Sequence, residues 1–341
     1  GGNYNTVVGD EAGTAITTGD TNTGVGYKAL ALTTTGSTNV GLGAYALQRN
    51  TTAAYNTGVG YDVLGSNTTG DLNVAIGYEA LGTNVAGDKS VAIGVQALYA
   101  QNPSGNADMY NTAVGYAAGT AVTTGIQNTL IGGLAGDAIT TGNYNVAVGD
   151  GSLTNNTTAA SNTAVGQASL QNNTTGATNT ALGRNALQLN TTASNNTAVG
   201  YASLGVNTTG TNNVAIGAAS LDANTTASNN VAVGVNTLGV NTTGASNTAI
   251  GHEALDANTT ASNNTAVGKG AMLRTTTGAN NTAVGFESLV INTTGANNVA
   301  IGDNALNVST TASNNTAVGS SALAANTTGA SNTAMGHNSL G

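Results

Sequence analysis

The sequence contains no cysteine and no tryptophan, and it has one proline in 341 residues. Without cysteine, disulfides cannot indicate the redox compartment. Charged residues are only 6% of the chain, and the net charge of −9 argues against nucleic acid as a partner, because phosphates require a basic surface. No apolar run approaches the roughly 18 residues of a membrane span, and no signal peptide is evident, so we expect no direct membrane insertion.

Low charge and few aromatic residues are typical of disordered chains, but Val, Ile and Leu recur here at fixed positions. A core of five residues, such as NTAVG at 196–200 or NVAIG at 213–217, occurs in twenty copies and returns with a period of seventeen. Only the copy that opens at Ser90 differs, because it is longer by four positions. Such a short fixed period predicts a solenoid.

We number each copy from its asparagine as position 1. Position 5 is always Gly, position 4 is Val, Ile, Leu or Met, position 3 is Ala or Gly in 18 copies, and position 9 is Leu in 16. Strand alternation places positions 2 and 4 on one face and position 3 on the other. Because positions 2 and 4 carry the larger apolar residues, we predict that they point into the coil and that position 3 points outward.

The rest of each copy then closes the coil. Glycine at position 5 ends the strand, a second short strand places the position-9 leucine inside, and the Asn-Thr-Thr-Gly segment provides a turn. Three copies have Gly at position 9, and in those copies position 12 becomes Ile16, Val122 or Ile139. This exchange of one apolar group for another is typical of a packed interior of fixed volume.

The predicted fold class is therefore all-β: a parallel β-solenoid or β-roll of about twenty coils, each one period of seventeen long. We expect a single continuous solenoid over residues 1–341, with a more decorated half at 1–150, a loop insertion at 99–110 and a regular, spacer-like half at 151–341. The chain begins in repeat phase, so we expect a mature product or a fragment. Stacked asparagines and turn glycines form the predicted structural ladder: Asn196, Asn213, Asn230, Gly200, Gly217 and Gly234.

The core NTAVG or NVAIG, followed by YASL at 201–204, resembles the YadA-like head repeats of trimeric autotransporter adhesins and of phage tail fibres. The resemblance covers essentially the whole chain. It implies a left-handed parallel β-roll, side-by-side association of three chains and an extracellular adhesive rod on a cell surface or virion. The period is longer than the fourteen usual in that family, and the additional positions fall in the Asn-Thr-Thr-Gly segment.

The predicted partner is a second copy of the chain. The flat strip of Ala and Gly at position 3, which we predict to face outward, would let another backbone approach closely, and this arrangement predicts a homo-oligomer such as a trimer. Because the repeats reach both ends of the chain, end-to-end stacking into a filament is the alternative. Host or surface glycans and proteins are further candidate partners.

Residues for catalysis and metal binding are sparse. His252 and His337 lie five copies apart, and the six basic residues are scattered. We therefore predict no catalytic residues, no metal site, no cofactor and no enzymatic activity. A polysaccharide-degrading enzyme on a β-helix would need clustered carboxylates, which the sequence does not indicate.

Surface recognition has better candidates in the first half, where ten of eleven tyrosines lie. The candidate surface-binding residues, most of them in or near the longer copy, are Tyr61, Tyr78, Tyr99, Asp108, Met109, Tyr110 and Tyr116. Loops on rigid scaffolds often carry recognition. Asn-Thr-Thr triplets are formal glycosylation acceptors, represented by Asn190, Asn207 and Asn224.

The sequence thus favours a non-enzymatic structural or adhesive extracellular fibre. One alternative is a phage tail-fibre shaft that recognises host glycans. Another is an ice-binding protein that uses arrays of threonine. Against ice binding, the two adjacent threonines of the turn point to opposite faces, whereas a flat array requires threonines at alternate positions.

Overall fold

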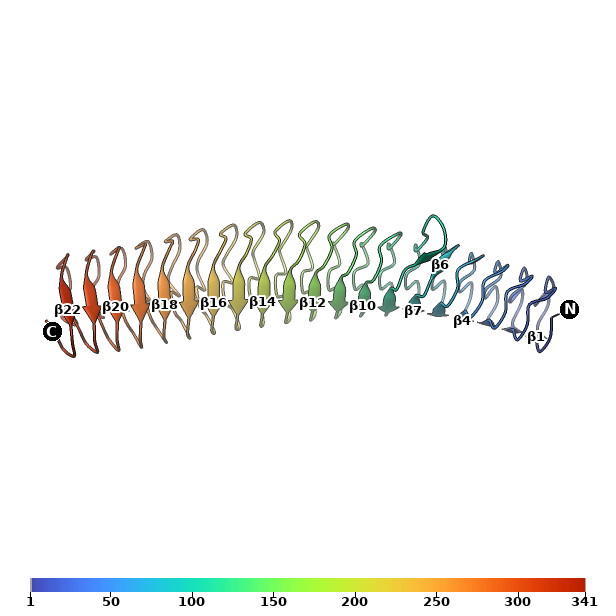
Figure 1. Cartoon of the computed structure of the whole chain (residues 1–341), viewed down its shortest axis with the longest axis horizontal. Helices are drawn as coiled ribbons and strands as arrows, with labels where there is room; N and C mark the ends of the chain where they lie inside the picture. The colour runs from blue at the N-terminus through green and yellow to red at the C-terminus, as the bar shows by residue number, and fades with distance from the viewer. Residues whose placement is uncertain (1, 341) are drawn as a thin grey trace. The chain divides into compact units, whose positions relative to one another are not determined.

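The computed structural model describes residues 2–340, and the chain divides into two compact units, residues 1–175 and 176–341. The fold is an all-β parallel β-solenoid of about 19 turns with about 17 residues per turn, and residues 2–340 contain no helix. Figure 1 shows a strand arrow in successive coils, the additional strand β6 (Gly87–Asp88) beside the loop, and irregular chain that leads from one coil to the next. The predicted fold class is confirmed, whereas the single continuous domain stays a prediction.

One short strand per coil builds the sheet of each unit. The first unit contains β1 (Thr6–Val8), β2 (Thr23–Val25), β3 (Val40–Leu42), β4 (Thr57–Val59), β5 (Val74–Ile76), β6 (Gly87–Asp88), β7 (Val91–Ile93), β8 (Ala107–Asp108), β9 (Thr112–Val114), β10 (Thr129–Ile131), β11 (Val146–Val148) and β12 (Thr163–Val165), of which β6 and β8 form a separate pair. The second unit contains β13 (Thr180–Leu182), β14 (Thr197–Val199), β15 (Val214–Ile216), β16 (Val231–Val233), β17 (Thr248–Ile250), β18 (Thr265–Val267), β19 (Thr282–Val284), β20 (Val299–Ile301), β21 (Thr316–Val318) and β22 (Thr333–Met335).

Within each unit, the strands of neighbouring coils pair in parallel and in register. Thr197 pairs with Val214, one full period further along the chain, and the same offset holds for neighbouring strands in both units. The offset is larger only across the longer copy, where Val91 pairs with Thr112. Equivalent positions of successive coils therefore form continuous columns, and neighbouring residues within a column are about 4.8 Å apart.

The direction in which the strand residues point is the reverse of the prediction. Position 3 is buried, as at Ala198 and Ala215, while position 4 is turned to the surface, as at Ile216. The interior of each coil is narrow and is filled by the position-9 leucines: a Cβ at Gly58 would lie 3.4 Å from the Cδ1 atom of Leu47. Only Ala or Gly usually fits opposite such a leucine, so the larger residues at positions 2 and 4 lie outside.

This reversal corrects the predicted mode of self-association. The Ala/Gly strip is a wall of the core, so it offers no flat face to another chain. What each unit exposes along its sheet is the Thr/Val column of position 2 and the aliphatic column of position 4.

The predicted asparagine ladder is confirmed and lies inside the coil. Asn196, Asn213 and Asn230 are fully buried. The Nδ2 atom of Asn196 donates to the carbonyl oxygen of Gly210 at 2.8 Å, and its Oδ1 atom accepts from the backbone N–H of Asn213 at 2.9 Å. Each asparagine thus closes its own coil and links that coil to the next.

The glycines of the predicted ladder hold a backbone conformation that other residues rarely adopt. Gly200 has φ = +132°, and a Cβ there would lie 2.6 Å from the carbonyl oxygen of Gly217. Gly217 and Gly234 repeat this geometry.

The second strand predicted after this glycine does not form. Positions 7 and 9 have left-handed backbone, as at Ala202 (φ 54°) and Leu204 (φ 49°), so the chain follows a series of turns that still bury the leucine.

The volume exchange read from the sequence is confirmed. Val122 and Ile139 are fully buried, and a Cβ at Gly136 would lie 2.8 Å from the Cδ1 atom of Ile139. Leu130 at position 3 adds to the same filling, because its Cδ2 atom would lie 2.8 Å from that Cβ. Larger residues at positions 3 and 12 therefore occupy the space that the missing leucine leaves.

The turn glycines provide a direct test of the coil geometry. We expect Gly217→Ala to lower the free energy of unfolding by about 3 kcal/mol, because the added Cβ would meet the backbone of the next coil in a conformation that disfavours it. Gly105→Ala is the matched control, since no atom lies within 4 Å of its added Cβ, and we expect a change within about 0.5 kcal/mol. Urea unfolding followed by circular dichroism measures both; equal effects would contradict the assignment.

Candidate functional site

A regular surface runs along each unit on its strand face, which we define as positions 2 and 4 of the paired strands. Neither position carries a charged residue in any of the twenty copies; position 2 is Thr in 13 and Val in seven. Several position-4 side chains are substantially exposed: Val25, Ile76, Ile131, Leu182, Ile216, Ile250, Val284, Ile301 and Met335. The small residue at position 3 in 18 of the twenty copies was the sequence signal for this arrangement, because a narrow interior leaves little space for a side chain there.

A second feature is a run of tyrosine rings just after strands β2 to β5 in the first unit. The ring centroids of Tyr27 and Tyr45 are 5.2 Å apart, those of Tyr45 and Tyr61 are 5.5 Å apart, and those of Tyr61 and Tyr78 are 5.6 Å apart. Tyr61 and Tyr78, two of the candidate surface-binding residues, are stacked. Sequence reasoning did not connect Tyr27 and Tyr45 to them, because Tyr45 lies one position later in its copy. The rings pack against one another, so they form no open, coplanar platform.

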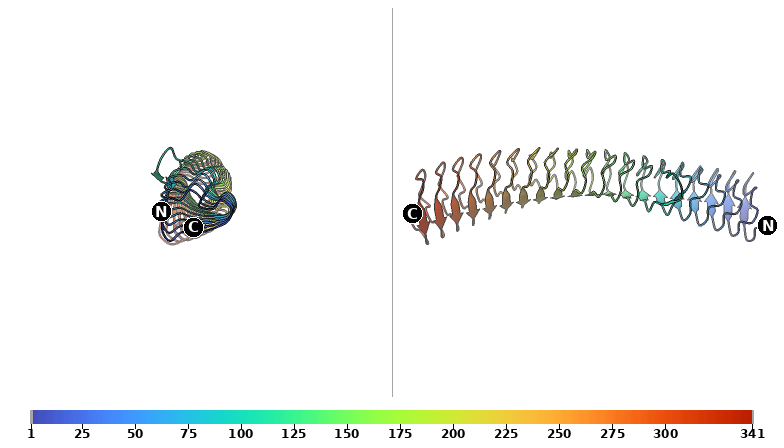
Figure 2. Two further views of the ribbon diagram at one scale, coloured as in Figure 1. Left: turned by 90° about the vertical axis from the view of Figure 1, so that its right-hand side faces the viewer. Right: turned by 45° about the horizontal axis from the view of Figure 1, so that its top comes forward.

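The longer copy leaves the coil as a loop. In Figure 1 it stands out beside β6, and in the end-on view of Figure 2 it lies outside the outline of the coils around it. Its return strand β8 pairs in parallel with β6, so that Ala107 lies opposite Gly87 and Asp108 opposite Asp88. The Oγ1 atom of Thr69 donates to Oδ1 of Asn106 at 2.9 Å and holds the tip.

Three side chains at the base of this loop form a polar cluster, which we call the loop cluster: Lys89, Asp108 and Tyr110. The Nζ atom of Lys89 lies 2.7 Å from Oδ2 of Asp108, and the hydroxyl of Tyr110 donates to the same oxygen at 2.9 Å. The ammonium group also lies 5.3 Å from the centroid of the Tyr110 ring. Hydrogen bonds from Lys89 and then Tyr110 lower the pKa of Asp108, and the bond to Asp108 raises the pKa of Lys89.

The remaining surface candidates, Tyr116, Met109 and Tyr99, differ in how far they are exposed. Tyr116 is exposed, as expected, on the coil that follows the loop. Met109 is only 1% exposed and packs beside Gly87, so its prediction as a binding residue is wrong: it fills the core where the loop re-enters the coil. Tyr99 is partly buried, and its Cε2 atom would lie 3.0 Å from a Cβ at Gly82.

The prediction that the Asn-Thr-Thr asparagines accept glycans is also corrected. Asn190, Asn207 and Asn224 are fully buried and form a second ladder, in which Nδ2 of Asn207 donates to Oδ1 of Asn190 at 3.1 Å. The same Nδ2 atom donates to the carbonyl oxygen of Gly210 at 2.9 Å. A glycan attached to these nitrogens would break the ladder and would not fit inside the coil.

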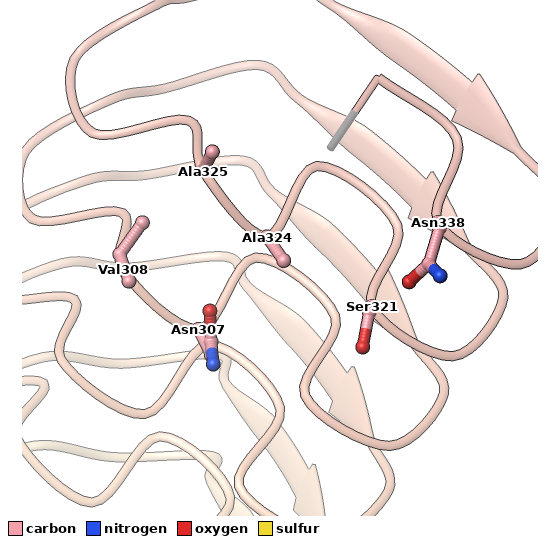
Figure 3. A pocket seen from close by; sticks show the side chains of 6 residues that line it. All are labelled: Asn307, Val308, Ser321, Ala324, Ala325 and Asn338. Carbon is pink, nitrogen blue, oxygen red and sulfur yellow. The ribbon is translucent and has the colours of Figure 1, made fainter.

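Two surface cavities lie in the second unit. The larger, of about 720 Å³, is lined by neutral side chains of neighbouring coils, shown in Figure 3: Asn307, Val308, Ser321, Ala324, Ala325 and Asn338. The smaller, of about 170 Å³, is lined by one carboxylate, Asp222, and by uncharged residues. Neither cavity combines a nucleophile with a base.

Two carboxylates approach one another in the second unit, those of Asp222 and Asp256, an arrangement that the sequence did not indicate. A Cβ at Gly239 would lie 2.7 Å from Oδ1 of Asp256 and 3.7 Å from Oδ1 of Asp222, two coils apart. Burial raises the pKa of both aspartates, and Glu253 and Asp222 add to the shift at Asp256. Among the described residues, no group of three or more His, Cys, Asp or Glu side chains is arranged to hold a metal ion.

Comparison with known proteins adds no family assignment: no protein-family model matches the chain, and no curated protein sequence matches it. Residues 2–340 include no helix with the length and apolar character needed to cross a membrane.

Acid should loosen the loop before it affects the coils. The lowered pKa of Asp108 means that its contribution to stability is present above its unfolded pKa of about 3.9 and is lost as the pH falls through the lower folded value. We expect hydrogen exchange at residues 102–108 to increase as the pH falls below about 4, after correction for the intrinsic exchange rate. Asp108→Asn should remove this dependence, and Asp150→Asn, in a coil without the loop, should retain it.

Proposed function

We propose that the chain is a segment of a non-enzymatic, extracellular fibre whose strand faces pack against other copies of the same chain. The strand face carries this proposal. It is uncharged in every coil, its side chains stand in register, and it presents aliphatic groups to the surface. Contiguous apolar surfaces larger than a few hundred square ångströms typically mark interfaces.

The resemblance of the repeats to YadA-like heads supports the same proposal. In that family three parallel rolls associate side by side, on a cell surface or a virion. A trimer would remove the strand faces of all three chains from water. An end-to-end filament is the alternative assembly, and it would use the terminal coils and leave the strand faces exposed.

Substitution on the strand face tests the assembly. We expect Ile216→Asp combined with Ile250→Asp to convert the assembly into single chains of 32.9 kDa, because buried aspartates without partners oppose association. The control is Val206→Asp with Val240→Asp, two exposed aliphatic residues at position 11, outside the strand face: Val240 is 45% exposed and Ile250 is 40% exposed.

Native mass spectrometry and electron microscopy give the readout. Wild-type protein that is monomeric at all concentrations would contradict the proposal. Equal dissociation by both pairs of substitutions would exclude the strand face as the interface.

Ice binding is a second candidate function, favoured by one observation. With position 3 buried, Thr at position 2 and an aliphatic residue at position 4 lie on one face, at alternate positions along the strand. The array repeats about every 4.8 Å across the coils and about every 6.6 Å along the strand. A regular array of hydroxyl and methyl groups without charge is suited to an ordered water lattice. The objection from the adjacent turn threonines does not apply to this face.

Thermal hysteresis distinguishes the two candidates. If the strand face binds ice, wild-type protein should depress the freezing point below the melting point. Thr248→Lys with Thr265→Lys should abolish that gap, because bulky charged side chains interrupt the array. Thr209→Lys with Thr226→Lys, in the exposed turn, should not. No hysteresis in a preparation that contains free single chains would exclude ice binding.

A further inference from the structure

The residue immediately before position 1 has left-handed backbone in every coil, yet the two units fill this place with different residues. In the second unit seven of the ten are asparagine: Asn195, Asn212, Asn229, Asn263, Asn280, Asn297 and Asn314. In the first unit none of the ten is asparagine: Tyr4, Thr21, Thr38, Tyr55, Leu72, Lys89, Tyr110, Gln127, Tyr144 and Ser161. We call these ten residues the pre-asparagine column of the first unit.

The first unit accepts backbone strain at this column. Asparagine tolerates the left-handed region, whereas tyrosine, leucine and β-branched threonine are disfavoured there. Tyr55 and Leu72 both have φ = 61°, and Tyr144 has φ = 59°. The same coil geometry in the second unit shows that asparagine fits, so the fold itself does not require these residues.

Core packing does not explain the strained residues either. Tyr55 is 61% exposed, Leu72 is 49% exposed and Tyr144 is 53% exposed. Their side chains contribute little to the interior and carry a conformational cost. Asparagine at these positions would relieve the backbone strain without a change of fold. That strained residues stand there instead indicates that their exposed side chains bind a partner.

The column is contiguous through the loop cluster. Tyr55, Leu72, Lys89 and Tyr110 lie on successive coils, and the 5.3 Å separation between the Lys89 ammonium and the Tyr110 ring agrees with their being neighbours. The loop adds Asp108, so aromatic and aliphatic surfaces lie beside an ammonium, a carboxylate and a phenol. At about 4.8 Å per coil, the stretch from Tyr55 to Tyr144 is about 24 Å long.

The charged groups beside the column also make contacts within the chain. Asp71 accepts from the backbone N–H of Ala54 at 2.7 Å, Asp88 accepts from that of Asp71 at 2.7 Å, and Asp108 pairs with Lys89. Three carboxylates lie beside a single lysine that is already paired, and this negative balance disfavours a polyanion. What remains available is tyrosine and leucine surface with polar groups at its centre, a combination suited to an uncharged ligand rich in hydroxyl groups.

We propose that the pre-asparagine column between Tyr55 and Tyr144, with the loop cluster, is a binding surface for a neutral glycan chain that lies across the coils. This proposal rests on the fibre function, since it names what such a fibre would recognise. The tyrosine rings contact the apolar faces of the sugar rings, and Lys89 and Asp108 exchange hydrogen bonds with their hydroxyl groups.

The test uses substitutions that should favour the fold. The triple variant Tyr55→Asn, Leu72→Asn and Tyr144→Asn places the residue used in the second unit at three strained positions and leaves the loop cluster intact. We expect its midpoint of thermal unfolding to rise by about 3 °C. Affinity electrophoresis in gels that contain hydroxyethyl cellulose, dextran, galactomannan or α-mannan should show wild-type retardation by at least one polymer. That apparent affinity should fall at least tenfold in the variant.

The reverse substitutions in the second unit are the control. Asn212→Tyr with Asn229→Tyr should lower the midpoint and leave the retardation unchanged. The proposal is overturned if none of the four polymers retards the wild type, if the triple variant binds equally well, or if only heparin or polylysine causes retardation. A lower midpoint in the triple variant would overturn the strain argument. Native mass measured on the same samples reports the assembly separately, so loss of glycan binding with intact assembly leaves the fibre proposal standing.

Discussion

The structure depends on the buried asparagine at position 1, which is joined in most coils by a second buried asparagine at position 12 that donates to the same carbonyl oxygen. In the coil that begins at Asn196, the Nδ2 atoms of Asn196 and Asn207 donate to the carbonyl oxygen of Gly210 at 2.8 and 2.9 Å. The next coil repeats the arrangement with Asn213 and Asn224. Because buried polar groups are costly unless they are paired, the position-1 ladder continues through the copies with only Ser90 in place of asparagine, whereas the position-12 ladder is interrupted where another residue replaces asparagine. The strict period of the sequence is the consequence: an asparagine out of register would leave an amide without a partner inside the core.

The same closure decides what the coil shows to its surroundings. With two amide ladders and a column of leucines inside, the cross-section has space for only a methyl group at most position-3 sites. The larger residues of the strand are therefore turned outward, and the chain exposes Thr, Val and Ile in continuous columns. This is unusual for a protein surface, where charged residues normally interrupt apolar patches. The surface that makes self-association the favoured proposal is thus a by-product of how the interior is filled.

Sequence reasoning could predict the period, the solenoid, the asparagine ladder, the inward leucine and the loop, because each depends on periodic spacing or on the chemistry of one residue type. Sequence reasoning could not predict which face of the strand lies inside.

In so short a strand, alternation fixes only that position 3 lies opposite positions 2 and 4. The larger apolar residues at positions 2 and 4 favoured those positions for the interior, and this choice was wrong. The predictions of a second strand and of accessible glycosylation sites were also wrong. Positions 7 and 9 have left-handed backbone although most copies have no glycine there, so the sequence gives no sign of it. The Asn-Thr-Thr triplet that begins at Asn207 is the same sequence whether its asparagine lies in an exposed turn or in a buried ladder. The tyrosine contacts and the loop cluster depend on side-chain positions that spacing alone does not specify.

The two units therefore solve one backbone problem in two ways. Where a coil only has to continue the stack, asparagine at the left-handed position before position 1 keeps the conformational cost low, and the second unit largely follows this rule. Where the first unit places Tyr55, Leu72 or Tyr144 at the same position, it holds these residues in a backbone conformation that they disfavour and gains exposed aromatic and aliphatic surface. A solenoid can tolerate this, because each coil is held mainly by its neighbours and a local cost does not spread along the stack. The repeat thus supplies a scaffold whose surface can be altered one coil at a time, with the internal hydrogen-bond ladders left unchanged.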